Sequence, residues 1–159
     1  MAKKSDDAGR MFATNRAARH NYLIVSTLEA GLVLAGAEVK SVRGGKVVLK
    51  DAFATIRDGE VHLHNMHISP YVHATGTRLD PDRSRKLLLH RREIRKLERR
   101  IKQEGFTLVP MRLYLARGVV KCEIGLAKGK KQYDKRAAKR EEDARRDMRA
   151  ALARRQKGR

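Results

Sequence analysis

The chain has 159 residues, with 38 Lys and Arg against 18 Asp and Glu, so its formal net charge is +20. This excess opposes compaction and favours a polyanionic partner. No apolar run approaches the roughly 20 residues that span a bilayer, and the polar start, with Asp6 and Asp7, is unlike a secretory signal. The single cysteine, Cys122, excludes an intramolecular disulfide and fits a reducing cytosol. We therefore expect a cytoplasmic protein that binds nucleic acid rather than a membrane.

The composition divides the chain into three zones. Residues 1–14 form a polar lead-in that we expect to be mobile, 15–127 have the pattern of one folded RNA-binding domain, and 128–159 form a tail. The tail has fourteen Lys and Arg against five Asp and Glu, net +9, and few large apolar residues. Such a segment should be disordered when free and helical only on a partner. From composition alone, a non-specific basic tail that adds affinity for any RNA is the favoured interpretation.

The first predicted elements are a strand and a helix. Residues 22–25 form a short apolar run typical of a strand. A helix is predicted over 34–42, where apolar residues recur at helical spacing, and Gly44 and Gly45 should end it.

A hairpin is predicted next. An Asp-Gly pair at 58–59 lies between apolar runs at 47–56 and 61–68, which is a strong short-range hairpin signal. His62 and His64 share one face of the second run, so a metal site is conceivable, but no Cys or carboxylate cluster supports it. We expect no metal and no cofactor.

The middle of the chain predicts a basic helix. A short strand over 86–89 is followed by 91–104, in which apolar residues recur at three and four positions and Gly105 marks the end. His90 precedes the helix as its expected N-cap. The segment 83–102 contains ten Lys and Arg against two Glu. It is either a phosphate-binding surface or the solvated face of an amphipathic helix.

A second hairpin is predicted near the end of the folded zone. Its strands cover 107–116 and 119–126, around an Arg-Gly pair. Apolar residues alternate with polar residues and Gly125 in the second strand, which indicates one buried and one wet face. Cys122 lies on the apolar face and is therefore predicted to be a buried thiol rather than a nucleophile.

Together these elements predict a fold that is mainly β with helices. We expect a small antiparallel β-barrel of the oligonucleotide-binding type, with flanking helices and a basic C-terminal tail. A flatter α+β sheet fits the same periodicity. The sequence has no nucleophile elbow, no phosphate-cradling loop and no Cys-rich metal motif, so we expect no enzyme.

Four segments also carry a family resemblance. They include Asn-Arg-Ala-Ala-Arg-His-Asn-Tyr at 15–22 and Gly-Lys-Lys-Gln-Tyr-Asp-Lys-Arg at 129–136; the others are 29–41, with Arg43 and Gly44, and 80–89. Because these segments follow one another in this order along the chain, the chain resembles the small protein B family. These are the bacterial SsrA-binding proteins, which are partners of transfer-messenger RNA (tmRNA). The resemblance implies a six-stranded barrel and a role in ribosome rescue by trans-translation.

The resemblance also implies the partners. The barrel would bind the tRNA-like domain of tmRNA and, with elongation factor Tu, enter the vacant A site of a stalled ribosome. The tail would lie in the empty mRNA channel against small-subunit ribosomal RNA. We expect a monomeric adaptor.

The implied site residues fall into two groups. The positions that would face tmRNA are Asn15, Arg16, Arg19, His20, Tyr22, Glu29, Lys40, Arg43, Leu89, Lys128, Gly129, Lys130 and Lys131. Those that would meet the decoding centre are Tyr133, Asp134, Lys135 and Arg136. Arg and Lys suit phosphates, and flat side chains suit unstacked bases. Glu29 must bond a base donor or orient an Arg, and Leu89 is equally compatible with a plain core position.

Two features depart from the family pattern. Tyr133 stands where several relatives have His, and Ala137 and Ala138 follow where many place an acidic or hydroxyl residue first. The alternative function is a general RNA chaperone or ribosomal structural protein built on the same barrel and tail. A metal-dependent nuclease is a third class, without a motif to support it.

Overall fold

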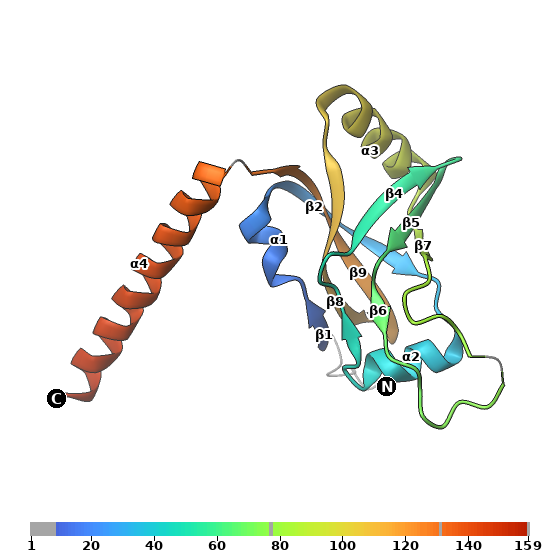
Figure 1. The fold of residues 1–159 in the computed structure, drawn as a ribbon, viewed down its shortest axis with the longest axis horizontal. Coiled ribbons are helices and arrows are strands. Elements are labelled where there is room, and N and C mark those ends of the chain that lie inside the picture. The colour runs from blue at the N-terminus through green and yellow to red at the C-terminus, as the bar shows by residue number, and fades with distance from the viewer. Residues whose placement is uncertain (1–8, 77, 131, 159) are drawn as a thin grey trace, which may run out of the picture.

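The computed structural model describes residues 9–76, 78–130 and 132–158, without the side chains of 132–134. In chain order the elements are β1 (Met11–Thr14), α1 (Arg16–Asn21), β2 (Tyr22–Leu32), α2 (Gly36–Arg43), β3 (Val47–Val48), β4 (Phe53–Arg57), β5 (Glu60–His64), β6 (His67–Ile68), β7 (Arg85–Leu88), α3 (Arg91–Glu104), β8 (Thr107–Ala116), β9 (Val119–Gly129) and α4 (Gln132–Lys157). Helices surround the strands, and α4 projects away from them (Figure 1). None of the described helices has the length and hydropathy needed to cross a bilayer.

One antiparallel sheet organises the fold. Its strands follow the order β1-β8-β4-β5-β7-β2-β9, and β3 pairs separately with β6. The long strand β8 also pairs with β9, from Thr107 opposite Ala127 to Ala116 opposite Val119. Starting from β8, the pairing passes through β4, β5, β7, β2 and β9, and the pairing of β9 with β8 brings it back to its starting strand. The predicted class, mainly β with helices, is confirmed.

The main core is formed by buried side chains of this sheet together with those of α2 and α3. Leu63 of β5, Leu108 of β8 and Ile124 of β9 are fully buried in this core. Val42 of α2 and Leu97 of α3 pack into the same cluster. The two helices lie at opposite ends of the sheet (Figure 1), so each covers one end of the core.

Both predicted hairpins are confirmed, with loops of two residues. Asp58 and Gly59 have φ of 52° and 72°, and Arg117 and Gly118 have φ of 53° and 74°. Positive φ at both central residues is the type I′ geometry, whose twist matches that of paired strands. Glycine adopts this φ without strain, which explains why it occupies the second position of each turn.

Several predicted boundaries were wrong. The apolar runs at 47–56 and 61–68 are not continuous strands, because turns with Asp51 at φ 61° and Asn65 at φ 61° interrupt them. The breaks separate β3 and β6 from the hairpin and let them pair with each other. The first strand was predicted over 22–25 but extends to Leu32. Exposed polar residues after Val25 interrupt its apolar pattern, so the sequence did not indicate its full length. Helix α2 begins at Gly36, two residues after its predicted start.

The N-terminal part of the sheet was not predicted. Strand β1 precedes the expected domain start and pairs with β8. Helix α1 covers the outer face of β8 and β9, where Ala18, Met111 and Ala127 form a second buried cluster. Gly125, predicted to be on a wet face, is buried here instead. A Cβ on Gly125 would lie 3.1 Å from the Sδ atom of Met111, so glycine allows this close packing.

Helix α3 and Cys122 agree with the predictions. The helix covers Arg91–Glu104, and the N–H of His90 donates to Glu93 Oε2 at 3.0 Å. Gly105 ends it in the left-handed conformation, with φ of 69°. The thiol of Cys122 is fully buried, and this burial, together with the charge of Glu123, raises its pKa to about 12. At neutral pH the group is therefore a packed thiol and not a thiolate.

Candidate nucleic-acid interface

The first predicted contact residues lie on and beside α1. Asn15 is buried, and its Nδ2 atom donates to the carbonyl of Pro110 at 2.9 Å. It therefore fixes the start of α1 to strand β8 and does not face outward. Arg16, Arg19 and His20 are exposed on the helix that Asn15 anchors. Asn15 thus positions a small cationic surface rather than forming part of it.

A groove of about 840 Å³ lies between α1, the β8–β9 strands and α4. Its lining includes one histidine, His20, and the ionisable side chains of Arg16, Arg19, Arg112, Glu123, Glu141, Glu142, Arg145, Arg146 and Arg149. Arg112 pairs with Glu123 inside this set. Cations outnumber carboxylates, so the groove is suited to an anionic ligand such as a phosphate chain.

The start of the tail lies beside the end of α1. Tyr22 pairs with Gly129 across β2 and β9. The backbone N–H of Lys130 donates to the carbonyl of Asn21 at 2.9 Å, and its Nζ atom donates to the carbonyl of Arg19 at 3.1 Å. The structure therefore brings Arg19, Tyr22, Gly129 and Lys130 together.

Two other predicted positions at the start of the tail lie elsewhere. Lys128 is opposite Leu23 in the ladder, and its Nζ atom is 4.9 Å from the ring centre of Phe106. The guanidinium of Arg100 is 4.7 Å from the same ring, so Lys128 lies toward α3 rather than α1. Lys131 lies outside the described residues.

Glu29 has a partner within the protein. The hydroxyl of Tyr114 donates to Glu29, and the Arg112 guanidinium carbon lies 5.1 Å from the Tyr114 ring centre. Burial raises the pKa of Tyr114, and so do the hydrogen bond and the charge of Glu29. The phenol therefore stays protonated and keeps Glu29 as its acceptor. Within the protein Glu29 therefore bonds Tyr114 and not an Arg, and its contact with a base donor of the RNA stays a prediction.

The predicted residues of α2 form a separate group. Lys40 and Arg43 are exposed, and the Lys40 Nζ atom is 5.2 Å from the Tyr71 ring centre. The carbonyl of Arg43 accepts a hydrogen bond from Arg10 at 3.3 Å. Helix α2 lies at the other end of the sheet from α3 (Figure 1), apart from the start of the tail. Leu89 is half-buried and packs against the main core, as its alternative interpretation predicted.

The buried network beneath α2 was missed by the sequence analysis. Glu38 and Arg85 are 5% and 1% exposed, yet both carry a charge. Arg85 Nε and Nη2 donate to Glu38 Oε2 at 2.8 Å and 2.6 Å, and Arg85 also donates to the carbonyls of Met66 and Pro81. Arg83 donates to the same carboxylate. The network ties α2 to β7 and the loop before it.

The environment of Glu38 decides its charge. Burial by itself raises the pKa of this carboxyl group. The hydrogen bonds from Arg83, from the Ala35 N–H and from Arg85 together outweigh burial, so the pKa is lowered. Glu38 is therefore ionised at neutral pH and supports the helix that presents Lys40 and Arg43. No local sequence pattern indicates this pairing, because its members lie more than 40 residues apart in the chain.

The histidines have separate partners. His64 bonds Thr55 Oγ1 at 2.7 Å and Ser84 Oγ at 2.9 Å, whereas His62 lies 3.3 Å from Glu60. No group of three metal-ligating side chains occurs within residues 9–76, 78–130 and 135–158. The arrangement therefore gives no basis for assigning a metal to His62 and His64.

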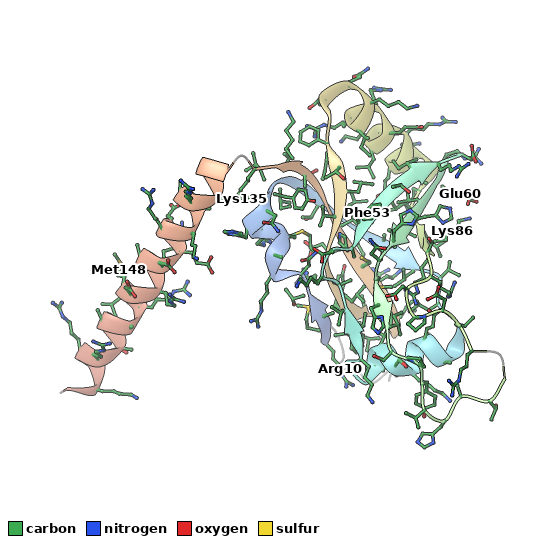
Figure 2. All side chains as sticks on the ribbon, in the orientation of Figure 1. Arg10, Phe53, Glu60, Lys86, Lys135 and Met148 are labelled. Carbon is green, nitrogen blue, oxygen red and sulfur yellow. The ribbon has the colours of Figure 1, made fainter. Side chains whose placement is uncertain are left out.

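The tail continues as α4. Lys135 is half-buried and Arg136 is exposed, while the side chains of Tyr133 and Asp134 lie outside the described residues. Met148 and Leu152 are 66% and 55% exposed, and Figure 2 shows Met148 on a part of α4 well apart from the sheet. Apart from its first turns near α1, the helix has little apolar support.

Comparison with known proteins assigns the chain to a family. The family described as SmpB protein matches residues 12–154. This chain belongs to the SmpB family. The SsrA-binding protein of Geobacillus thermodenitrificans (strain NG80-2) is 54% identical over 149 residues, which cover 94% of this chain and 96% of that protein. The SsrA-binding protein of Anoxybacillus flavithermus (strain DSM 21510 / WK1) is 53% identical, with 94% and 97% covered.

A solved structure agrees with this assignment. A chain of the structure described as "tmRNA-SmpB: a journey to the center of the bacterial ribosome" is 49% identical, with a TM-score of 0.62. The match covers 76% of this chain and 85% of that one. The SmpB family match begins inside β1 and ends within α4. All predicted site residues, from Asn15 to Arg136, lie within it.

Proposed function

We propose that this chain is a tmRNA-binding adaptor for the rescue of stalled ribosomes by trans-translation. It binds the tRNA-like domain of tmRNA, enters the A site with elongation factor Tu, and performs no covalent chemistry itself. The observation that carries this proposal is the likeness to SsrA-binding proteins over 94% of the chain. The net charge of +20 supports RNA as the ligand. We place the protein in the cytoplasm as a monomer.

The proposal includes a closed barrel of the oligonucleotide-binding type. Its support is the pairing of β8 with both β4 and β9, which leaves no free edge along that circuit of strands. Helices α2 and α3 would then plug the two ends. A closed scaffold holds its surface groups at fixed separations, which suits recognition of a folded RNA by shape.

We call the proposed tmRNA-binding surface the tmRNA clasp. One part of it lies on α1 and at the start of the tail. Arg16, Arg19 and Lys130 would bind phosphates, while His20 and Tyr22 offer flat faces for unstacked bases. Gly129 lets the chain approach a phosphate closely, since it has no side chain and the space where a Cβ would stand is open apart from its own chain neighbours.

The remaining predicted positions would act at other parts of the same interface. Lys40 and Arg43 on α2 would contact a second part of the tRNA-like domain. Glu29 would offer its free carboxylate oxygen to a base donor while Tyr114 holds it in place. Lys128 and Lys131 would add phosphate contacts, and Asn15 and Leu89 would position their neighbours.

The tail is proposed to be disordered when free and helical in the empty mRNA channel. The exposure of Met148 and Leu152 supports this, because an isolated helix with so little apolar burial is marginal in water. Tyr133, Asp134, Lys135 and Arg136 would meet the decoding centre. In the free protein, we expect amide signals from 132 onward to be narrow and poorly dispersed by NMR. Protected helical amides there would contradict folding on binding.

Binding selectivity tests the proposal directly. At about 0.15 M salt, we expect the tRNA-like domain of tmRNA to bind at least tenfold more tightly than a plain hairpin of equal charge. The reason is that non-specific phosphate contacts are common to both RNAs, whereas the shape of the domain is not. Equal affinities, measured by titration, would support the general RNA chaperone instead.

A further inference from the structure

Helix α3 carries a cationic surface that the proposed tmRNA clasp does not use. We call the side chains of Arg91, Arg92, Arg95, Lys96 and Arg99 the α3 face; all five are exposed. Ile94 and Leu97 are buried on the opposite side of the same helix. Figure 2 shows nitrogen-tipped side chains on α3 pointing away from the sheet. The cations recur at three- and four-residue spacing, so they form one continuous stripe.

The acidic residues of α3 do not neutralise this stripe. Glu93 accepts the N–H that begins the helix. Glu98 lies 3.2 Å from Lys102, and Glu104 lies 3.1 Å from Arg100. Within residues 9–76, 78–130 and 135–158, no carboxylate forms an ion pair with any member of the α3 face. Like charges at this spacing repel each other, so an external anion would relieve the repulsion.

The residue types of the α3 face indicate which class of ligand it can bind. No large apolar side chain of α3 is exposed, whereas membrane-bound helices and the centres of protein interfaces present apolar groups. Four of the five members are Arg, whose planar fork bonds two phosphate oxygens at once. The rise of an α-helix places Arg91 and Arg99 about 12 Å apart along the axis, a span that reaches several phosphates of a duplex. These features favour an RNA backbone.

The position of α3 separates this surface from most of the proposed clasp. Figure 1 shows α3 at the end of the sheet opposite α2, and α1 lies along the side of the sheet. We propose that the α3 face binds the phosphate backbone of a ribosomal RNA duplex while the α1 end and α2 hold tmRNA. The inference rests on the proposed function, because the ribosome supplies the second RNA. Double-stranded RNA is recognised mainly through its backbone and shape, so no base contact is required.

The test removes the charge of the α3 face in the full-length chain. The variant Arg91→Gln/Arg95→Gln/Arg99→Gln keeps the helix, because Gln and Arg have similar helix propensities. The matched control, Lys50→Gln/Arg78→Gln/Arg117→Gln, removes the same charge from exposed positions elsewhere. Affinity for ribosomes without mRNA and for the tRNA-like domain is measured between about 0.05 and 0.2 M salt.

The two variants should differ on ribosomes only. We expect the α3 variant to bind ribosomes at least tenfold more weakly at about 0.15 M salt, with a salt slope reduced by about two to three. Its affinity for the tRNA-like domain should stay within about twofold, and the control should stay within about twofold on both ligands. If circular dichroism shows that the triple variant is not folded, Arg95→Gln alone should reduce the slope by about one.

Three results separate the possibilities. A loss on ribosomes no larger than that of the control overturns the proposal and leaves the α3 face as a solvated surface. A tenfold loss toward the tRNA-like domain also overturns it, and assigns α3 to the tmRNA clasp through the neighbouring Lys128. If the unmodified chain does not prefer the tRNA-like domain, the proposed function fails, whereas the ribosome comparison still decides the role of the α3 face.

Discussion

Replacing Arg85 by Ala should destabilise the folded protein by about 3–5 kcal/mol, because it leaves the Glu38 carboxylate buried without its main partner. The side chains of Arg85 and Glu38 are 0% and 6% exposed, so water cannot replace the lost hydrogen bonds. A loss of this size is a large part of the about 5–15 kcal/mol that stabilises a typical domain. Urea unfolding followed by circular dichroism measures it.

The neighbouring residue provides a matched control. Lys86 pairs with Glu60 at 2.8 Å, but both side chains are more than 40% exposed. Lys86→Ala should therefore cost about 0–1 kcal/mol. If Arg85→Ala costs no more than Lys86→Ala, the buried network does not hold α2 in place.

The same network should respond to acid. The folded-state pKa of Glu38 lies below its ordinary value of 4.5, so the stabilisation is present above that pH. It is lost as the pH falls through the folded-state pKa, because the protonated carboxyl group no longer attracts the two guanidinium groups. The difference in unfolding free energy between the unmodified chain and Arg85→Ala should therefore shrink in acid.

Ending the chain after Gln132 should abolish tagging of stalled nascent chains while leaving affinity for the tRNA-like domain within about twofold. This truncation keeps every pair between β2 and β9, together with the hydrogen bonds from Lys130 to Asn21 and Arg19. It removes the segment proposed to meet the decoding centre. Tagging in a reconstituted translation reaction and RNA titration measure the two effects separately.

Two further chains identify what the tail contributes. Ending the chain after Ala127 also removes Lys128, Gly129 and Lys130, and should weaken binding of the tRNA-like domain at least tenfold, because phosphate contacts are lost with the clasp. A full-length chain with residues 133–159 in shuffled order keeps the tail's charge and should still fail to tag. If the shuffled chain tags normally, the tail acts only through its charge.

Elements with local signals were predictable from the sequence. Helix α3 has a buried stripe, an N-cap contact and a terminal Gly105, and its bounds were correct. The two hairpins were found because each turn needs glycine at positive φ. Such features depend on residues within a few positions of each other, which a sequence displays directly.

Long-range features were not predictable. Helix α1 was missed because its buried face is a single Ala18, and only its packing on Met111 explains the helix. Glu38 gave no signal either, since its partners come from a distant loop and strand. The candidate site followed the family resemblance. The structure places Asn15 inside the protein and gives Glu29 the partner Tyr114, which local patterns did not indicate.

The anchoring of the tail has a mechanical consequence. Strand β9 is paired with β2 up to Gly129, and Lys130 is bonded to the end of α1, so the tail departs from a fixed point on a rigid body. Helix α4 has 26 residues, and a straight helix of that length measures about 39 Å. Once the tail is helical, its number of residues sets the distance between the sheet and the last arginines of the chain, and each added turn increases that distance by about 5.4 Å.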